Sequence, residues 1–473
     1  MSKLFIFLIL LFNFTSSISQ ESDNTQLFRD IEPIVNQELP PYIVSQWKVD
    51  INFEALREIQ LPNSISLFLP ENPRTTLPID SFNAGDGYDI REEDDPPGPP
   101  YSIIPNFPLE KLSYYIVSMT DEYDVVLTIR NEKMSGTIIS GTKSYSINFD
   151  NTLHSHVLSD IKTSALPENA TYDVRDENAD VPRSTSNISI SNIKAHKVKG
   201  YQNTESRSQI FSLDMLVYYT EEARIAEGGN PNVPTDDADI LLQIEASINN
   251  TNSALSNSLV NSRVTLYYTG KVNGFILSPL GFPAGPRADL ENFRTDPIVQ
   301  FTRTLVGADA VSMIVADTNV IFTVCGIAHA QTIPQCGLNL PACSDQSSFD
   351  SYSYNLVNRL CDTEDNTFVH EFGHLLGANH TRAPNNLNQA TILGIENNGY
   401  PSAFAYDDGT FESIMKIFDN NRRLYFSNPN VLLNGSPTGV AGSEYNVENI
   451  NLLTPFMTVF RPRNDFIFED GFE

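Results

Sequence analysis

Three histidines within eleven residues are the strongest chemical feature of this sequence. Residues 370–380 read HEFGHLLGANH, so His370 and His374 are four positions apart and His380 follows six positions later. Residues four apart lie above one another on the same face of an α-helix, so the first two imidazoles can bind one ion. The spacing predicts a helix over the start of this segment and a metal site with His370, His374 and His380 as ligands.

Two further residues of the segment have the types that such a site needs. Glu371 directly follows the first histidine, so we predict its carboxylate beside the ion, as a general base acting on water and not as a ligand. Gly377 stands where the helix must end, and glycine tolerates the left-handed conformation that turns the chain back toward the ion. Three protein ligands leave a fourth tetrahedral position open, as in catalytic zinc sites. Three imidazoles also suit copper or nickel, but the adjacent glutamate favours hydrolysis.

The same segment resembles the extended zinc signature of the metzincin endopeptidases. Members of that group carry a methionine in a tight turn beneath the metal, and Met415 lies at a suitable distance after the third histidine, whereas Met457 is expected in the core. Ile417 stands where some metzincin branches have a tyrosine, so the chain is more similar to the reprolysin-like (adamalysin-like) branch. Thr381 departs from the aspartate that reprolysins usually have after the third histidine.

This resemblance implies a fold and an activity. The fold is an α+β or α/β metzincin catalytic domain, with a twisted mixed sheet, long helices and a small irregular C-terminal subdomain. The activity is zinc-dependent cleavage of proteins or peptides. Gly326, Ile327 and Ala328 resemble the edge strand along which metzincins bind an extended peptide as a further strand. The alternative is a catalytically silent binding or surface protein, but Glu371, the first residue that such a protein would lose, is present.

All four cysteines fall within 37 residues just before the predicted zinc helix. In an exported chain they are expected to form two disulfides, and three pairings are possible. We favour Cys336 with Cys343 as a local loop and Cys325 with Cys361 as a tie to the region before the helix. A second metal site is the alternative, although no C-x-x-C pair supports it. Residues 20–324 contain no cysteine, so a thiol from the N-terminal region cannot cap the zinc.

The N-terminus and the charge predict where the protein acts. Residues 1–19 combine Lys3, an apolar run and small residues, which is typical of an export signal and too short to favour a membrane helix. We expect a secreted monomer without membrane insertion. The formal charge of -29, from 59 acidic against 30 basic residues, argues against nucleic acid as a partner. A structural calcium ion in the acidic stretch 86–95 has no ligand spacing to support it.

Composition divides the chain into a signal peptide at 1–19, a β-rich propeptide-like domain at 20–163, a polar linker at 164–207, a catalytic domain at 208–463 and a short acidic tail at 464–473. Strand-like runs in the β-rich domain lie at 113–117, 125–129 and 137–147. His154 and His156 are expected on one solvent-exposed strand face, without a special role. Processing near Arg207 would release the catalytic domain.

The catalytic domain begins with an alternation of strands and helices. Strands are predicted at 213–219, 263–269 and 310–315, and helices at 235–259 and 296–306. This is a βαβαβ pattern, which predicts a sheet with parallel neighbours.

Overall fold

A computed structural model describes residues 26–35, 39–53, 64–70, 72–79, 81–84, 113–141, 143–166, 172–173, 210–233, 236–272, 275, 277–278, 284–316, 324–329, 350–382, 403–417 and 422–461. The predicted signal peptide, the predicted tail, the acidic stretch 86–95, Cys336 and Cys343 lie outside these residues, as does the linker apart from 164–166 and 172–173. In the described part of the chain, no helix is long and apolar enough to cross a membrane.

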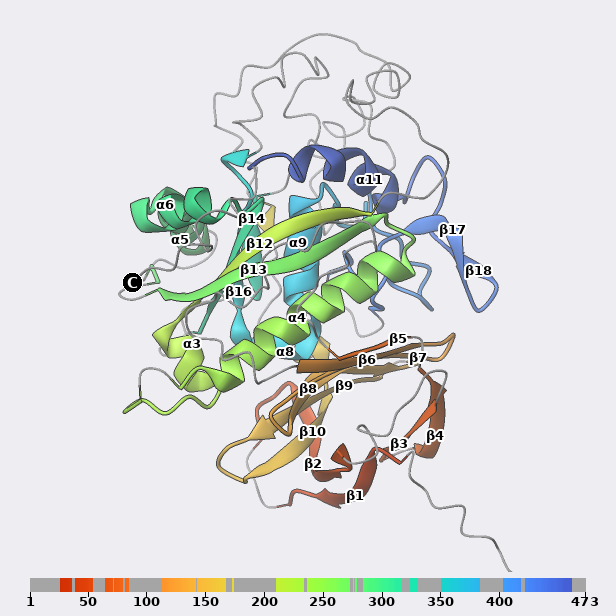
Figure 1. The fold of residues 1–473 in the computed structure, drawn as a ribbon. Helices are drawn as coiled ribbons and strands as arrows, with labels where there is room; N and C mark the ends of the chain where they lie inside the picture. Colours follow the sequence, from red (N-terminus) through yellow and green to blue (C-terminus); the bar gives the residue numbers. More distant parts are fainter. Residues whose placement is uncertain are drawn as a thin grey trace, which may run out of the picture.

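The N-terminal third of the chain forms an antiparallel sheet of eight strands, in the order β1-β2-β10-β9-β8-β7-β6-β5 (Figure 1). Its strands are β1 (Phe28–Pro33), β2 (Ile43–Ile51), β5 (Ser81–Ala84), β6 (Ser113–Met119), β7 (Tyr123–Arg130), β8 (Lys133–Ser140), β9 (Lys143–Asp150) and β10 (Ser155–Ile161). A separate hairpin comprises β3 (Ser64–Leu69) and β4 (Asn72–Pro78). The β-rich prediction is confirmed, but the run 137–147 is two strands, because Gly141 at φ 58° turns the chain between β8 and β9.

The prediction for the two N-terminal histidines is wrong for His156. Its side chain is buried, and its Nε2 accepts a hydrogen bond of 3.0 Å from the backbone N–H of Met134. The ring also packs edge-on against Phe149. Burial, reinforced by the nearby charge of Lys133, lowers the pKa of His156 from 6.5 to about 4. His156 is therefore a neutral, hydrogen-bonded part of the sheet.

This burial predicts acid sensitivity of the N-terminal sheet. The folded sheet holds His156 neutral, while the unfolded chain protonates it below pH 6.5, so stability is lost as the pH falls from 6.5 toward 4. We expect a loss of about 2 kcal/mol between pH 7 and pH 4.5 from this group. The free energy of unfolding at each pH can be measured by urea unfolding followed by the fluorescence of Trp47. This residue lies in β2 and is the single tryptophan of the chain. His156→Gln, which keeps an acceptor, should flatten this pH dependence; an equally steep profile would contradict the assignment.

The second sheet has six strands, in the order β11-β15-β16-β14-β12-β13. They are β11 (Tyr172–Asp173), β12 (Phe211–Thr220), β13 (Ser262–Val272), β14 (Ala310–Val315), β15 (Gly326–Ala328) and β16 (Tyr354–Asn358). Strands β13, β12, β14 and β16 are parallel to one another, whereas β15 runs antiparallel to β16. The predicted βαβαβ pattern and mixed sheet are confirmed.

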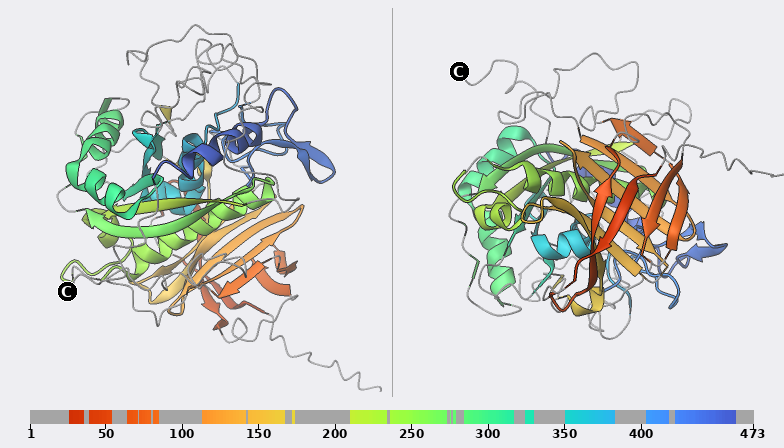
Figure 2. Two further views of the ribbon diagram at one scale, coloured as in Figure 1. Left: turned by 45° about the horizontal axis from the view of Figure 1, so that its top comes forward. Right: turned by 90° about the horizontal axis from the view of Figure 1, so that it is seen from below.

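Helices cover both faces of this second sheet. The helix α4 (Ala238–Asn257) begins three residues later than predicted, and its N-cap, Asp237, makes no side-chain cap bond. On the other face lie α5 (Ala284–Thr295) and α6 (Pro297–Val306), whose N-cap Asp296 accepts two backbone N–H bonds. Figure 1 and Figure 2 place α4 between the two sheets. Val126 and Ile139 of the N-terminal sheet accordingly share one apolar core with Ile244 of α4.

Candidate metal centre

The helix α9 (Thr367–Leu375) carries the first two histidines of the predicted site. It follows α8 (Arg359–Asp365), whose Asp362 accepts a 3.2 Å hydrogen bond from the N–H of Phe368 in the first turn of α9. The helix ends as predicted: Gly377 has a φ of 82°, in the left-handed region, and the chain reverses there. This reversal carries His380 back to the helix.

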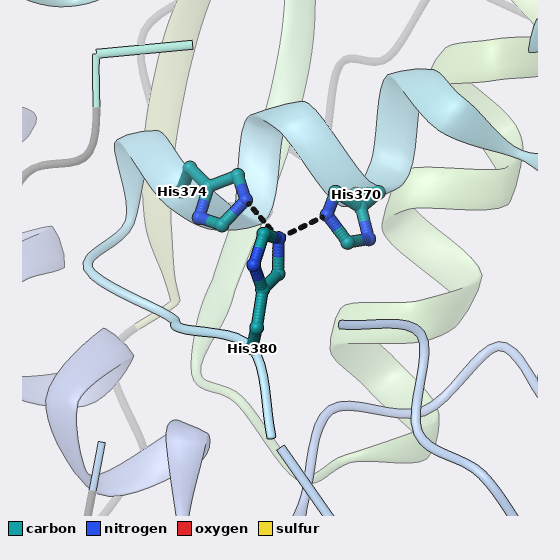
Figure 3. Close-up of side chains that lie close together, drawn as sticks. All are labelled: His370, His374 and His380. Carbon is teal, nitrogen blue, oxygen red and sulfur yellow. Dashed lines mark hydrogen bonds between the residues drawn. The ribbon is translucent and has the colours of Figure 1, made fainter. Parts of the chain in front are cut away.

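The three imidazoles converge on one point (Figure 3). The Nε2 atom of His380 lies 3.0 Å from Nε2 of His370 and 3.0 Å from Nε2 of His374. All three side chains are buried, and together they form a group whose ligand atoms lie within 4.8 Å of one another. Tetrahedral zinc with Zn–N bonds of about 2.05 Å would hold such nitrogens about 3.3 Å apart, close to this arrangement.

Backbone hydrogen bonds decide which ring nitrogens face that point. His370 Nδ1 lies 2.9 Å from the carbonyl oxygen of Ile414, and His374 Nδ1 lies 3.0 Å from that of Ala378. A carbonyl only accepts, so both Nδ1 atoms carry the proton and both Nε2 atoms present lone pairs. One proton on His380 could satisfy only one of them. A cation satisfies all three, so the donor set fits a divalent metal such as zinc.

Burial supports the same protonation state. It holds the pKa of His370 well below the ordinary value of 6.5, and the neighbouring His374 and His380 lower that pKa further. A neutral imidazole is the form that binds a metal. The ring of His370 is therefore ready to bind a metal at neutral pH.

The third histidine is held by a helix that the sequence did not connect with the site. The helix α11 (Asn446–Met457) contributes Asn446, whose Oδ1 accepts a 3.0 Å bond from the N–H of Asn379. Asn449 Nδ2 donates to the carbonyl of Gly377 at 2.8 Å. Both contacts fix the loop that ends at His380. These two hydrogen bonds join residues about 70 positions apart, and no local sequence pattern predicts them.

The methionine turn lies beneath the helix, as the resemblance implies. Met415 is fully buried, and the N–H of Lys416 closes a turn on the carbonyl of Ser413 at 2.9 Å. A Cβ atom built on Gly373 would lie 2.4 Å from the Met415 sulfur and 2.8 Å from the ring of Phe426. Glycine at position 373 therefore lets α9 rest directly on this turn. Met457 is buried in the core, as predicted.

On the other side of α9, Gly326 of β15 lies against the predicted base. A Cβ atom at Gly326 would fall 2.5 Å from Glu371 Cγ and 2.6 Å from its Oε1. The preceding residue, Cys325, forms the predicted disulfide with Cys361 of α8, and its carbonyl accepts a 2.7 Å bond from the N–H of Asn358. These ties fix the start of β15 beside the fully buried Glu371 carboxylate.

We expect Gly326→Ala to displace this carboxylate. The added methyl group would also lie 2.7 Å from Thr367 Cγ2, so neither the strand nor the helix offers room. A displacement near 1 Å is expected to lower the kcat of a hydrolysis at this centre about 100-fold, while bound zinc measured by atomic spectroscopy stays at the wild-type level. A wild-type kcat in this variant would show that Gly326 does not position Glu371.

The prediction that Gly326, Ile327 and Ala328 form the outermost strand needs correction. They form β15, but its outer side is covered by β11, which pairs parallel to it with Tyr172 opposite Ile327 and Asp173 opposite Ala328. The covering strand comes from the predicted linker, more than 150 residues before β15. Sequence distance alone hides this pairing.

Comparison with known proteins identifies the class. Residues 233–444 match the model of the Metallo-peptidase family M12B Reprolysin-like. A curated relative, the Peptidyl-Asp metalloendopeptidase of Pseudomonas aeruginosa, is 24% identical over 275 residues, which cover 53% of this chain and 40% of the relative. The chain thus spans less than half of that protein's length.

Two solved structures are similar at low scores. One, described as the structure of a chaperone-substrate complex, is 19% identical, has a TM-score of 0.38, and is matched over 54% of this chain and 35% of its own. The other, metalloproteinase-II from Bacteroides fragilis, is 12% identical, has a TM-score of 0.34, and is matched over 80% of this chain and 93% of its own.

Proposed function

We propose that this protein is a secreted zinc-dependent endopeptidase that hydrolyses peptide bonds of proteins. The observation that carries the proposal is the convergence of the imidazoles of His370, His374 and His380 on one point, with Glu371 directly after His370 on the same helix. The match of residues 233–444 to the reprolysin-like family model supports it. Export is supported by the composition of residues 1–19 alone.

The three histidines and Glu371 have different roles in the proposed reaction. His370, His374 and His380 would hold the zinc, which when bound lowers the pKa of water and polarises the scissile carbonyl. Glu371 takes the proton of the attacking water and returns it to the leaving amine. Its burial removes competing bulk water from the carboxylate. The backbone of β15 is placed to pair with an extended peptide once its outer side is free.

A casein assay on the purified full chain tests the function. Activity should vanish with a metal chelator, return with zinc, and coincide with one zinc ion per chain. Peptides with and without aspartate belong in the substrate panel, because the Pseudomonas relative is named for peptidyl-Asp bonds. A full chain that binds zinc but cleaves none of these substrates, either intact or after a cut in the linker, would favour the silent binding protein.

The pairing of β11 with β15 predicts that the intact chain is restrained. A peptide that adds to β15 must first displace residues 172–173. Replacing both Tyr172 and Asp173 with proline removes their backbone N–H donors. If one net hydrogen bond of about 1 kcal/mol is lost, kcat/KM should rise about fivefold. The same double replacement in a chain already cut in the linker should have a smaller effect; an unchanged kcat/KM in the intact chain would contradict the restraint.

A further inference from the structure

Residues at the turn between β6 and β7 of the N-terminal sheet form hydrogen bonds with the segment that follows the methionine turn. Arg423 donates to both carboxylate oxygens of Asp124, at 2.6 and 2.5 Å, and to the carbonyls of Thr120 and Asp121 at 3.0 and 3.2 Å. The backbone N–H of Leu424 also donates to Asp124, at 3.1 Å. The side chains of Asp124 and Arg423 are 0% and 6% exposed, so the pair is shielded from water.

From this ion pair, hydrogen bonds continue to the metal ligands. Tyr425, next to Leu424, accepts a 2.8 Å bond at its carbonyl from the N–H of Ile414. The carbonyl of Ile414 is the group that accepts the Nδ1 proton of His370 at 2.9 Å. Two bonds therefore separate the backbone that Asp124 holds from the ring of His370.

A ligand histidine needs such support. The partner of the second ring nitrogen fixes the tautomer and the ring plane, and loss of outer partners weakens metal binding. Here the carbonyl partner belongs to Ile414, directly before Met415, and that stretch is anchored on the opposite side by Arg423, whose N–H bonds the carbonyl of Glu412 at 2.9 Å. The N-terminal sheet thus holds the chain segment whose backbone orients His370.

We propose that Asp124 is a positioning residue for the metal centre, acting through Leu424 and Ile414 on His370. The N-terminal sheet then contributes to the zinc site itself, in addition to packing on the catalytic domain. This inference rests on the proposed zinc site. Asp124 is almost 250 positions before His370 in the sequence, and it lies in the N-terminal sheet and not in the sheet that α9 packs against.

The same strand β7 offers a matched control. At its other end, Arg130 pairs with Glu245 of α4 at 2.6 Å, and these side chains are 5% and 9% exposed. Both ion pairs are buried, both join the N-terminal sheet to the rest of the chain, and Glu245 lies on a helix that carries none of the three histidines. Asp124→Asn and Glu245→Gln each change one carboxylate to an amide.

Zinc affinity of the full chain, measured by competition with a chromogenic chelator, is the main readout, and the visible absorption of the cobalt-substituted protein is the second. Asp124→Asn is expected to raise the zinc Kd about tenfold and to alter the cobalt spectrum, because the ring of His370 is reoriented. Glu245→Gln should leave both at wild-type values. If Asp124→Asn fails to fold, Arg423→Lys, which keeps the charge but loses the second bond to the carboxylate, takes its place.

The outcomes distinguish failure of the proposed function from failure of the inference about Asp124. A wild-type chain that binds no zinc would overturn the proposed function together with this inference. A wild-type chain that binds zinc, with Asp124→Asn showing the same Kd and spectrum, would overturn the inference alone. Equal weakening by Glu245→Gln would do so too, since it would reduce the effect to general loosening of the interface.

Discussion

Glu371→Gln is expected to lower kcat by roughly 10²–10⁴-fold, the range that a positioned general base contributes. Glutamine matches glutamate in shape but cannot take a proton from water. The carboxylate is fully buried beside β15 and is absent from the group of three ligand nitrogens, so the metal should remain. Steady-state kinetics with a quenched-fluorescent peptide, together with zinc content, measure both effects.

The control for this variant is its zinc affinity. Glu371→Gln should bind zinc with a Kd within about twofold of wild type, since removal of a base is not removal of a ligand. Turnover near the wild-type rate would mean that another group takes the proton. Loss of the metal would instead place the carboxylate among the ligands, contrary to our assignment.

The second large effect is expected for His374→Ala, which should lose the metal and the activity together. His374 is one of three imidazoles around one point, and its removal leaves two. The zinc Kd should rise by more than about 100-fold, the upper range for loss of an outer partner. Dialysis against a weak chelator followed by metal analysis distinguishes this variant from Glu371→Gln.

Thermal unfolding with and without zinc provides an independent check. A metal that binds only the folded chain raises its stability with concentration, so wild type and Glu371→Gln should both gain on addition of zinc. His374→Ala should gain little. Full retention of zinc and activity by His374→Ala would remove the histidine from the site and leave the peptidase proposal without its centre.

The inferred role of Asp124 changes how the two halves of the chain are understood. The sequence suggested a propeptide-like domain that processing near Arg207 would release. Asp124 instead reaches into the segment behind the methionine turn, and Val126 shares the apolar core of the catalytic domain. We therefore expect the N-terminal sheet to remain with the catalytic domain after a cut in the linker, while such a cut would free β11.

The features of this protein that depend on local geometry could be predicted from the sequence. The helical period places His370 and His374 on one face, and glycine at position 377 allows the left-handed turn that brings His380 back. Short runs rich in apolar residues likewise predicted β12, β13 and β14 close to their observed bounds. In each case, the residues that define the feature are near neighbours in the chain.

The contacts that complete the site could be known only from the folded structure. Gly326 against Glu371, Asn446 against the loop before His380, Asp124 behind Ile414, and β11 over β15 all join segments far apart in sequence. The burial of His156 belongs with them, since its ring is enclosed by neighbouring strands. A side chain's partner across the fold depends on how whole sheets pack, and local periodicity carries no information about that packing.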